Sequence, residues 1–375
     1  MTKKIHVGLL FGGLSTEHEV SLSSARNVYK ALDKSKYDVS LIRIDKQGYW
    51  HLDATPDRLL GTADVAGQLA AEATETVFPT PAPEIGQLLP VQRDDGQVAQ
   101  LSQEGNHQKI DVIFPVLHGI NGEDGTIQGL LKLVNIPFAG ASVLGSAVGM
   151  DKDVMKRLLR DAGLPVPKFI VVPRPRRDAL VFSEVVDELG VPFFVKPANA
   201  GSSVGISRVA SEADFQPALD AAFNHDNKIL IEENVVGREI ECAVIGNEKP
   251  MASITGEITT EDTFYSYDAK YLNETGTTLT IPADIPGATS DYIRNLSIKV
   301  YQALCCEGFA RIDFFLKEDG EVLVNEINTI PGFTERSMFP VLWEHTGLSQ
   351  PDLVDRLVQL AIARHERDKN LKTSR

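Results

Sequence analysis

The sequence predicts a multi-domain α/β protein. Its 375 residues exceed what one hydrophobic core usually serves, so two or three domains are expected. The N-terminal part alternates strand-like and helix-like segments, a pattern typical of a doubly wound parallel sheet with helices on both faces. Later segments are strand runs and hairpins punctuated by Gly and Pro, which indicates further units rich in antiparallel sheet.

The N-terminal unit is expected to begin with a strand over residues 5–10 and a helix over residues 21–32. A strand over residues 111–117 and a helix over residues 126–135 close it. Residues 53–108 are weakly periodic and contain several prolines and many glutamines, so we expect a peripheral elaboration there.

Domain boundaries are expected near residues 140 and 235. A proline-rich segment follows an amphipathic helix in the first of these regions, and a new set of strands begins after the second. The chain would then divide into residues 1–140, 141–235 and 236–375.

Composition narrows the class of protein. The chain has 37 Lys and Arg against 52 Asp and Glu, and the net charge of -15 disfavours broad binding to nucleic acid or to anionic lipid. Its longest apolar stretches are strand-sized, and the N-terminus leads directly into a strand pattern instead of a secretion signal. We therefore expect a cytoplasmic protein with no nucleic-acid or membrane partner.

The strongest local signal is a hairpin that carries charged groups. Residues 310–316 and 322–328 are strand-like runs joined through Asp319 and Gly320. A two-residue turn at this pair would bring four polar side chains together, with Asp313 opposite Glu326 and Arg311 opposite Asn328.

Opposed carboxylates predict a metal ion. Like charges directly opposite each other destabilise a sheet unless something neutralises them. The oxygen donors of Asp313, Glu326 and Asn328 suit Mg²⁺ that is shared with the phosphates of a nucleotide. The alternative is a solvated polar sheet face. Phe315 and Val324 are expected on this same face, and Phe315 is included among the predicted nucleotide contacts.

A small-residue loop predicts a phosphate site. Lys196 precedes the Gly/Ser-rich stretch 198–205, whose backbone N–H groups can surround an anion while the lysine supplies positive charge. The segment could equally be a plain hairpin turn. Lys152 is a second candidate phosphate ligand, for which an ordinary surface lysine is the alternative.

A short acidic segment is a candidate for the remaining nucleotide contacts. Glu232, Glu233 and Val235 lie at the end of a buried-looking strand and resemble a hinge that contacts adenine. Glu239 follows as a candidate partner for the ribose. Either Glu232 or Glu239 could instead be a solvated charge at a sheet edge.

In order and spacing these groups resemble the ATP-grasp arrangement. Three further segments, residues 12–21, 118–126 and 264–271, extend the resemblance to the D-alanine:D-alanine ligase family over nearly the whole chain. The resemblance implies a three-domain ATP-grasp fold, usually as a homodimer. It also implies that two D-alanine molecules are joined for peptidoglycan synthesis while ATP becomes ADP and phosphate, with two Mg²⁺ ions that Mn²⁺ can replace.

The same resemblance implies roles for individual residues. Glu17 would fix the ammonium group of the first D-alanine, with Ser202 and Tyr271 as its hydrogen-bonded partners. Arg311 and the backbone N–H of Gly332 would stabilise the oxyanion formed when the second D-alanine attacks.

Three more positions follow from the resemblance. Lys270 would contact the γ-phosphate, Ser337 the carboxylate of the second D-alanine, and His118 would line the same pocket. Glu233 departs from the family, which frequently has lysine there, and this change matters little if the adenine contact is a backbone one.

Two other functions fit the same motifs. One is an ATP-grasp ligase that joins D-alanine to D-lactate or D-serine, against which the dipeptide-type pattern of residues 264–271 argues. The other is a non-catalytic nucleotide-binding regulator, which could dispense with Glu17, Arg311 or Glu326, all of which are present.

Overall fold

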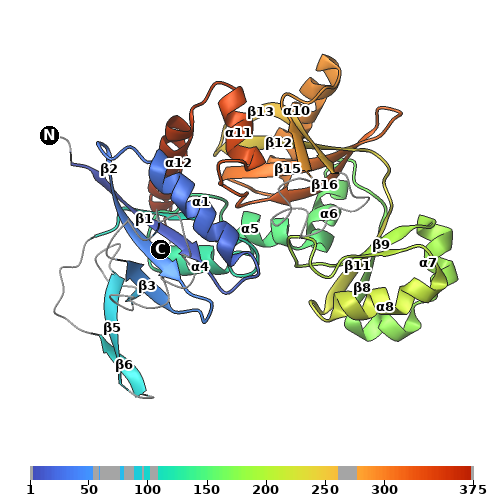
Figure 1. Ribbon diagram of the computed structural model, residues 1–375, viewed down its shortest axis with the longest axis horizontal. Coiled ribbons are helices and arrows are strands. Elements are labelled where there is room, and N and C mark those ends of the chain that lie inside the picture. Colours follow the sequence, from blue (N-terminus) through green and yellow to red (C-terminus); the bar gives the residue numbers. More distant parts are fainter. Residues whose placement is uncertain are drawn as a thin grey trace.

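A computed structural model describes residues 3–53, 59, 77–79, 88–94, 97–101, 109–260 and 277–372. Their strands form four sheets (Figure 1). The smallest of these sheets contains β4 (Val77–Pro79), β5 (Leu88–Asp94) and β6 (Gln97–Leu101), and its labelled strands point away from the rest of the molecule in Figure 1.

The first large sheet is built from N-terminal strands in the order β3-β2-β1-β7. Strand β1 pairs in parallel with β2 and β7, whereas β3 is an antiparallel edge strand. The bounds of these strands are β1 (Ile5–Gly12), β2 (Tyr37–Ile44), β3 (Trp50–Asp53) and β7 (Val112–Pro115).

Both faces of this sheet are buried. Val7 and Leu9 of β1 pack in one core with α1 (His18–Ala31) and α12 (Gln350–Lys369), while Leu10 packs in a second core with α4 (Thr126–Leu133). Alternate residues of one strand therefore enter different cores, as a doubly wound sheet requires. The predicted α/β fold class is confirmed.

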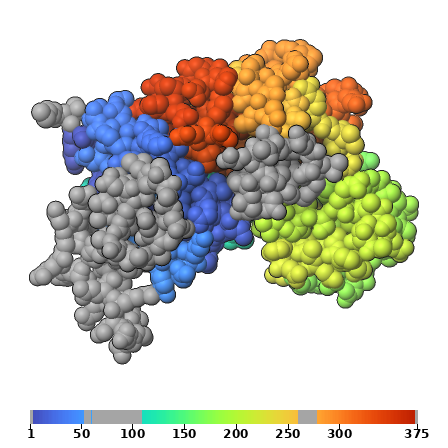
Figure 2. Space-filling view, in the orientation of Figure 1, coloured from blue at the N-terminus to red at the C-terminus, as the bar shows by residue number. Residues whose placement is uncertain are grey.

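The second sheet is antiparallel, in the order β10-β9-β11-β8. Its strands are β8 (Phe169–Pro173), β9 (Phe193–Pro197), β10 (Ser207–Val209) and β11 (Lys228–Glu233). Helices α7 (Phe182–Leu189) and α8 (Glu212–Phe223) pack apolar side chains against its strands to form one core, and a short 3-10 helix, η1 (Arg174–Ala179), follows β8. Figure 2 shows this part of the chain as a yellow-green lobe of its own.

The third sheet has the order β14-β13-β12-β15-β16. Its strands are β12 (Arg238–Gly246), β13 (Met251–Thr260), β14 (Thr277–Thr280), β15 (Gly308–Leu316) and β16 (Val322–Asn328). Helix α10 (Gly287–Ala303) packs on one face and α11 (Met338–His345) on the other. The second face shares its core with the first sheet, so the N-terminal and C-terminal parts of the chain are packed together.

Two helices connect the sheets. They are α5 (Val143–Met150) and α6 (Lys152–Asp161). Met155 and Leu159 of α6 lie in the core of the third sheet, although this helix precedes the second sheet in the sequence. The division at residues 140 and 235 remains a prediction. None of the helices in the described ranges is long and apolar enough to cross a membrane.

The hairpin of β15 and β16 corrects the expected turn. The N–H of Lys317 donates to the carbonyl of Glu321, and this hydrogen bond encloses three residues. The last of them, Gly320, has a positive φ of 88°. The predicted two-residue turn was therefore wrong. A β-bulge then shifts the register between Asp313 and Phe314.

The bulge restores the predicted pairs at the far end of the hairpin. Arg311 faces Asn328 and Asp313 faces Glu326, as expected. Val324, however, pairs with Phe314 and is buried in the core beneath the sheet, so its expected place beside Phe315 was wrong.

Candidate active site

A cavity of about 390 Å³ collects side chains from all three large structural units. Its walls include the loops after β1, β7, β9 and β16, the start of α6, and the strands β12, β15 and β16. Eleven of the predicted site residues line it: Glu17, His118, Lys152, Ser202, Glu239, Arg311, Asp313, Glu326, Asn328, Gly332 and Ser337.

A row of carboxylates crosses three neighbouring strands. Glu241 on β12 pairs with Asp313 on β15, which pairs in turn with Glu326 on β16. These residues project away from the apolar core because alternate β15 residues such as Ile312 enter it. Three acidic groups therefore meet on one face of the sheet.

Arg311 partly neutralises this row. Its Nε and Nη2 donate to the two carboxylate oxygens of Asp313 at 2.7 and 2.8 Å, and Nε lies 2.9 Å from Glu241. Burial lowers the pKa of Arg311, but Asp313 and Glu241 outweigh burial and raise that pKa, so the guanidinium stays charged. The acidic groups still outnumber it.

The donor set of this face suits a hard divalent cation. The side chains of Asp313, Glu326 and Asn328 offer oxygen, the ligand that Mg²⁺ prefers. Across the described ranges no three Asp, Glu, His or Cys side chains form a ready-made metal site. A cation here would need further oxygen ligands, such as those of nucleotide phosphates.

Glu17 and Ser202 meet across the cavity. The Ser202 hydroxyl donates to a Glu17 carboxylate oxygen, although the two residues are 185 positions apart. Ser202 and Ser203 have positive φ values of 50° and 60°, which is uncommon for residues other than glycine. The loop after β9 therefore adopts a constrained shape that brings Ser202 to the N-terminal unit.

His118 lines the cavity, yet both ring nitrogens are used within the protein. Nδ1 lies 2.9 Å from the Ile330 carbonyl and Nε2 lies 3.0 Å from the Ser24 hydroxyl. A carbonyl only accepts, so Nδ1 carries the proton and Nε2 accepts. Burial lowers the pKa of His118, which favours this neutral form. His118 thus holds the loop that leads to Gly332.

The loop after β16 has little space beside Gly332. A Cβ atom there would lie 2.8 Å from the hydroxyl of Ser337, which is too close. That hydroxyl accepts from the N–H of Thr334 at 3.0 Å. Glycine here therefore lets the Ser337 hydroxyl approach the backbone without having to shift.

The predicted phosphate lysines differ in position. Lys152 lines the cavity, donates to the carbonyl of Ala200 at 2.7 Å, and lies 3.6 Å from Glu326. Lys196 does not line the cavity and instead donates to a buried carboxylate oxygen of Glu232. The other predicted residues that lie outside its lining are Glu232, Glu233, Val235 and Phe315.

The predictions for Lys270 and Tyr271 lie outside the described residues. Phe315 pairs with Glu239 on the neighbouring strand, so it adjoins the cavity wall through a residue that lines it.

Sequence reasoning missed two acidic groups in the cavity. Glu241 could have been found, because it alternates with Glu239 on β12 and so shares its face. Glu123 is buried, accepts from the N–H of Gly119 at 2.7 Å, and has its Oε1 without a hydrogen-bond partner in the described structure. Burial, with the nearby Glu17, raises the pKa of Glu123 well above its ordinary value.

The fold and the cavity define the class of protein. An antiparallel sheet and a larger five-stranded sheet contribute to one cavity that is lined by Lys152 and a carboxylate row, which is the ATP-grasp arrangement. Comparison with family models matches residues 6–141 to "D-ala D-ala ligase N-terminus" and residues 158–359 to "D-ala D-ala ligase C-terminus".

Full-length relatives agree with these matches. The chain is 49% identical to a D-alanine–D-alanine ligase from Shouchella clausii, over 100% of this chain and 99% of the relative. It is 52% identical to D-alanine–D-alanine ligase A from Chromobacterium violaceum, over 99% of each chain.

A solved structure is similar along the whole chain. The D-alanine-D-alanine ligase from Coxiella burnetii matches with a TM-score of 0.85 and 36% identity, over 98% of this chain and 97% of that one. The chain belongs to the D-alanine–D-alanine ligase family, whose members are ATP-dependent ligases.

Proposed function

We propose that this chain joins two D-alanine molecules into D-alanyl-D-alanine, a precursor of peptidoglycan, while ATP is converted to ADP and phosphate. The observation that carries the proposal is that one cavity unites the Glu17–Ser202 pair with Arg311 and the carboxylate row. The 49% and 52% identities to D-alanine–D-alanine ligases support the choice of substrate.

In the first half-reaction a carboxylate oxygen of D-alanine attacks the γ-phosphorus of ATP. The bond from that phosphorus to the ADP oxygen breaks, and D-alanyl phosphate forms. Glu17, oriented by Ser202, holds the ammonium group of this D-alanine, together with Tyr271. Lys152 and Lys270 contact the phosphates, and holding both reactants in line supplies much of the rate enhancement.

Asp313, Glu326 and Asn328 would hold magnesium, and the all-oxygen donor set fits this ion. When bound, two Mg²⁺ ions, or Mn²⁺ in their place, would offset the negative charge of the phosphates. Asn328 is already oriented, because its side-chain oxygen accepts from the N–H of Ile330 at 3.1 Å. Lys196 is proposed to contact the phosphates as well, and Glu232, Glu233, Val235, Glu239 and Phe315 are proposed to hold the rest of the nucleotide.

In the second half-reaction the ammonium group of another D-alanine releases a proton to water, and the amine attacks the carbonyl carbon of the acyl phosphate. The second proton that the nitrogen loses as the amide forms leaves with the phosphate. The oxyanion that develops would accept from Arg311 and from the N–H of Gly332 before the carbon–oxygen bond to phosphate breaks. Within the described residues the contacts of Arg311 use Nε and Nη2, so Nη1 retains its donors for this oxygen. Ser337 would bind the second carboxylate, and His118 would keep the Gly332 loop in place.

A phosphate-release assay tests the proposal. With ATP, Mg²⁺ and D-alanine, phosphate and D-alanyl-D-alanine should appear in equal amounts, and neither should form without D-alanine. If ATP binds but D-alanine elicits no phosphate, the chain is a nucleotide-binding regulator and the proposal fails.

The second substrate needs its own comparison. A D-Ala:D-Ser ligase from Enterococcus faecalis matches this chain with a TM-score of 0.84 and 34% identity, over 96% of this chain and 100% of that one. D-alanine, D-serine and D-lactate should therefore be offered as acceptors across a range of pH. Preference for D-serine or for D-lactate near neutrality would overturn the assignment.

We also infer from the family that the chain acts as a homodimer in the cytoplasm. Light scattering should give two chains per particle, and a monomeric particle with full activity would contradict the dimer.

A further inference from the structure

A buried charge cluster lies behind the predicted phosphate site. Lys156 is fully buried, at 0% exposure, and its ammonium nitrogen lies 2.5 Å from one carboxylate oxygen of Glu232. Lys196 donates to the other oxygen of the same carboxylate. Lysine is almost never fully buried without a specific reason, and this one lies outside the cavity lining.

Three elements bring the cluster together. Lys196 on β9 faces Leu230 of β11, so Glu232 is its diagonal neighbour on the same side of the sheet. Lys152 and Lys156 are four residues apart on α6 and therefore share one face of the helix. Lys152 reaches the cavity wall, and Lys156 lies one helical turn deeper.

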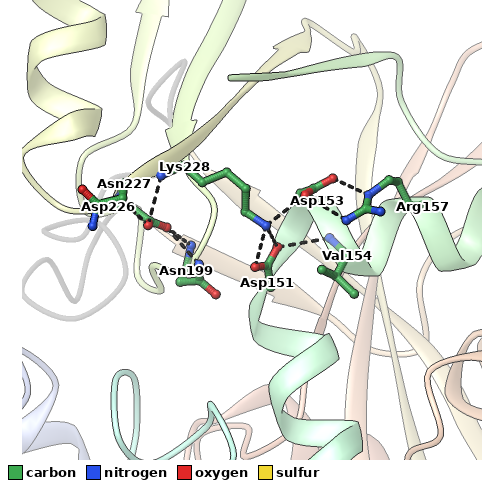
Figure 3. A network of polar contacts seen from close by, with 8 residues as sticks. All are labelled: Asp151, Asp153, Val154, Arg157, Asn199, Asp226, Asn227 and Lys228. Atoms are coloured by element: carbon green, nitrogen blue, oxygen red, sulfur yellow. Dashed lines mark hydrogen bonds and ion pairs between the residues drawn. The ribbon is translucent and has the colours of Figure 1, made fainter. Parts of the chain in front are cut away.

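The start of α6 is tied to the second sheet near this cluster. The ammonium group of Lys228, on β11, contacts Asp151 at 2.7 Å and Asp153 at 2.9 Å (Figure 3). Asp151 also caps the helix by accepting from the N–H of Val154. These contacts hold α6 against the strand that carries Glu232.

The cluster carries more positive than negative charge. One carboxylate is shared by two lysine side chains, although one ammonium group would be enough to neutralise it. Burial lowers the pKa of Lys156, and the nearby Glu232 opposes this shift by favouring the charged form. Burial raises the pKa of Glu232, but Lys156 and Lys196 outweigh burial and hold that pKa below its ordinary value, so the carboxylate is ionised. An uncompensated buried cation is costly unless an anion lies close by.

We propose that Lys156 is a positioning residue for nucleotide binding: by compensating Glu232, it leaves the charge of Lys196 available to the polyphosphate of ATP. Without Lys156, the carboxylate of Glu232 would neutralise the charge of Lys196. Lys196 would then attract phosphate only weakly. The inference rests on the proposed function only in taking ATP as the nucleotide.

The competing explanation is purely structural, with Lys156 serving to fasten α6 to β11. The two explanations differ for a double variant. If charge is what matters, removing Glu232 as well as Lys156 restores an uncompensated Lys196. If fastening is what matters, removing the second partner cannot help.

The test measures dissociation constants for ATP and for inorganic tripolyphosphate by calorimetry, with Mg²⁺ and without D-alanine. Lys156→Met should weaken both ligands roughly tenfold. Lys156→Met/Glu232→Gln should recover most of the loss for tripolyphosphate. Tripolyphosphate lacks the base, so it separates phosphate binding from any contact of Glu232 with adenine.

Arg157→Met is the matched control, because it removes another cation of α6 whose carboxylate partner, Asp153, keeps its contact with Lys228. Its affinity for tripolyphosphate should stay near that of the wild type. Unchanged binding in Lys156→Met, or a double variant weaker than the single one, would overturn the inference.

If Lys156→Met does not fold, Glu232→Gln alone tests the inference. It should bind tripolyphosphate at least as tightly as the wild type, and weaker binding would contradict the inference. Because D-alanine is absent throughout, a wild type that binds ATP but makes no dipeptide would refute the proposed function and leave this result intact.

Discussion

Two charged regions of the site have opposite balances. On β12, β15 and β16, three carboxylates surround one guanidinium, that of Arg311. Between α6, β9 and β11, two lysines surround one carboxylate, that of Glu232. The first region attracts a cation and the second an anion.

The difference shows how a metal–nucleotide complex would be oriented. Its magnesium would lie against the acidic strands and its phosphates towards the lysines, with Lys152 between them, 3.6 Å from Glu326. In each region like charges lie close together, which is energetically costly. The bound complex would neutralise both, so variants that change either balance should test this comparison.

The largest effect is expected for Arg311→Ala. It leaves Asp313 and Glu241 without their cation and removes an oxyanion donor. Turnover should fall about a thousandfold, and the free energy of unfolding should fall by about 3 kcal/mol. Steady-state kinetics and denaturant unfolding measure the two losses.

Arg311→Lys is the control for charge alone. It should recover much of the stability but little of the turnover, because lysine lacks the bidentate geometry. Full turnover in Arg311→Lys would show that Arg311 is not the oxyanion donor.

Glu326→Gln should have the next largest effect. It removes one negative charge from the acidic region with little change in volume, so turnover should fall at least about a hundredfold while the fold is retained. Kinetics over a range of Mg²⁺ concentrations, with circular dichroism, would measure both. Glu321→Gln, at the exposed turn of the same hairpin, should behave like the wild type, and near-normal activity in Glu326→Gln would contradict the metal assignment.

Ser202→Ala should have a smaller effect, confined to D-alanine. It removes the hydroxyl that orients Glu17, so KM for the first D-alanine should rise about tenfold with ATP affinity unchanged. Adding Ser202→Ala to Glu17→Gln should raise this KM by a smaller factor than adding it to the wild type, because the two residues act as a pair. Fully additive losses would show that the contact has no role in substrate binding.

The smallest effect is expected for Glu123→Gln, and it depends on pH. The folded-state pKa of Glu123 is raised above its unfolded value, so the wild type loses stability as pH rises from the unfolded value, about 4.3, towards the folded one. Glutamine removes this loss and can still accept from Gly119. The variant should therefore gain roughly 2 °C in Tm relative to the wild type between pH 5 and pH 8, and a difference in Tm that does not change with pH would contradict the buried-carboxyl explanation.

Much of the acidic region could be predicted because it is local. Strand alternation and one hairpin were enough to pair Asp313 with Glu326. The three-residue turn and the bulge compensate for each other, and neither follows from residue types alone. Glu241 is 72 positions away from Asp313 in the sequence and pairs with it across neighbouring strands. The same alternation of side chains along a strand could have placed Glu241 on this face.

The lysine region could not be predicted in the same way. Its contacts join helix α6 to two strands of the second sheet. No periodicity in the sequence predicts that Lys156 is buried. The contact between Ser202 and Glu17 depends likewise on how the second sheet lies against the N-terminal unit. Tertiary packing decides both.

Oxygen transfer tests the central claim most directly. D-alanine labelled with ¹⁸O in its carboxylate is incubated with ATP, Mg²⁺ and the wild-type protein, and the phosphate is examined by mass spectrometry. If the carboxylate attacks the γ-phosphorus at this site, each phosphate released should carry one ¹⁸O atom. Phosphate without ¹⁸O, formed together with dipeptide, would contradict the account.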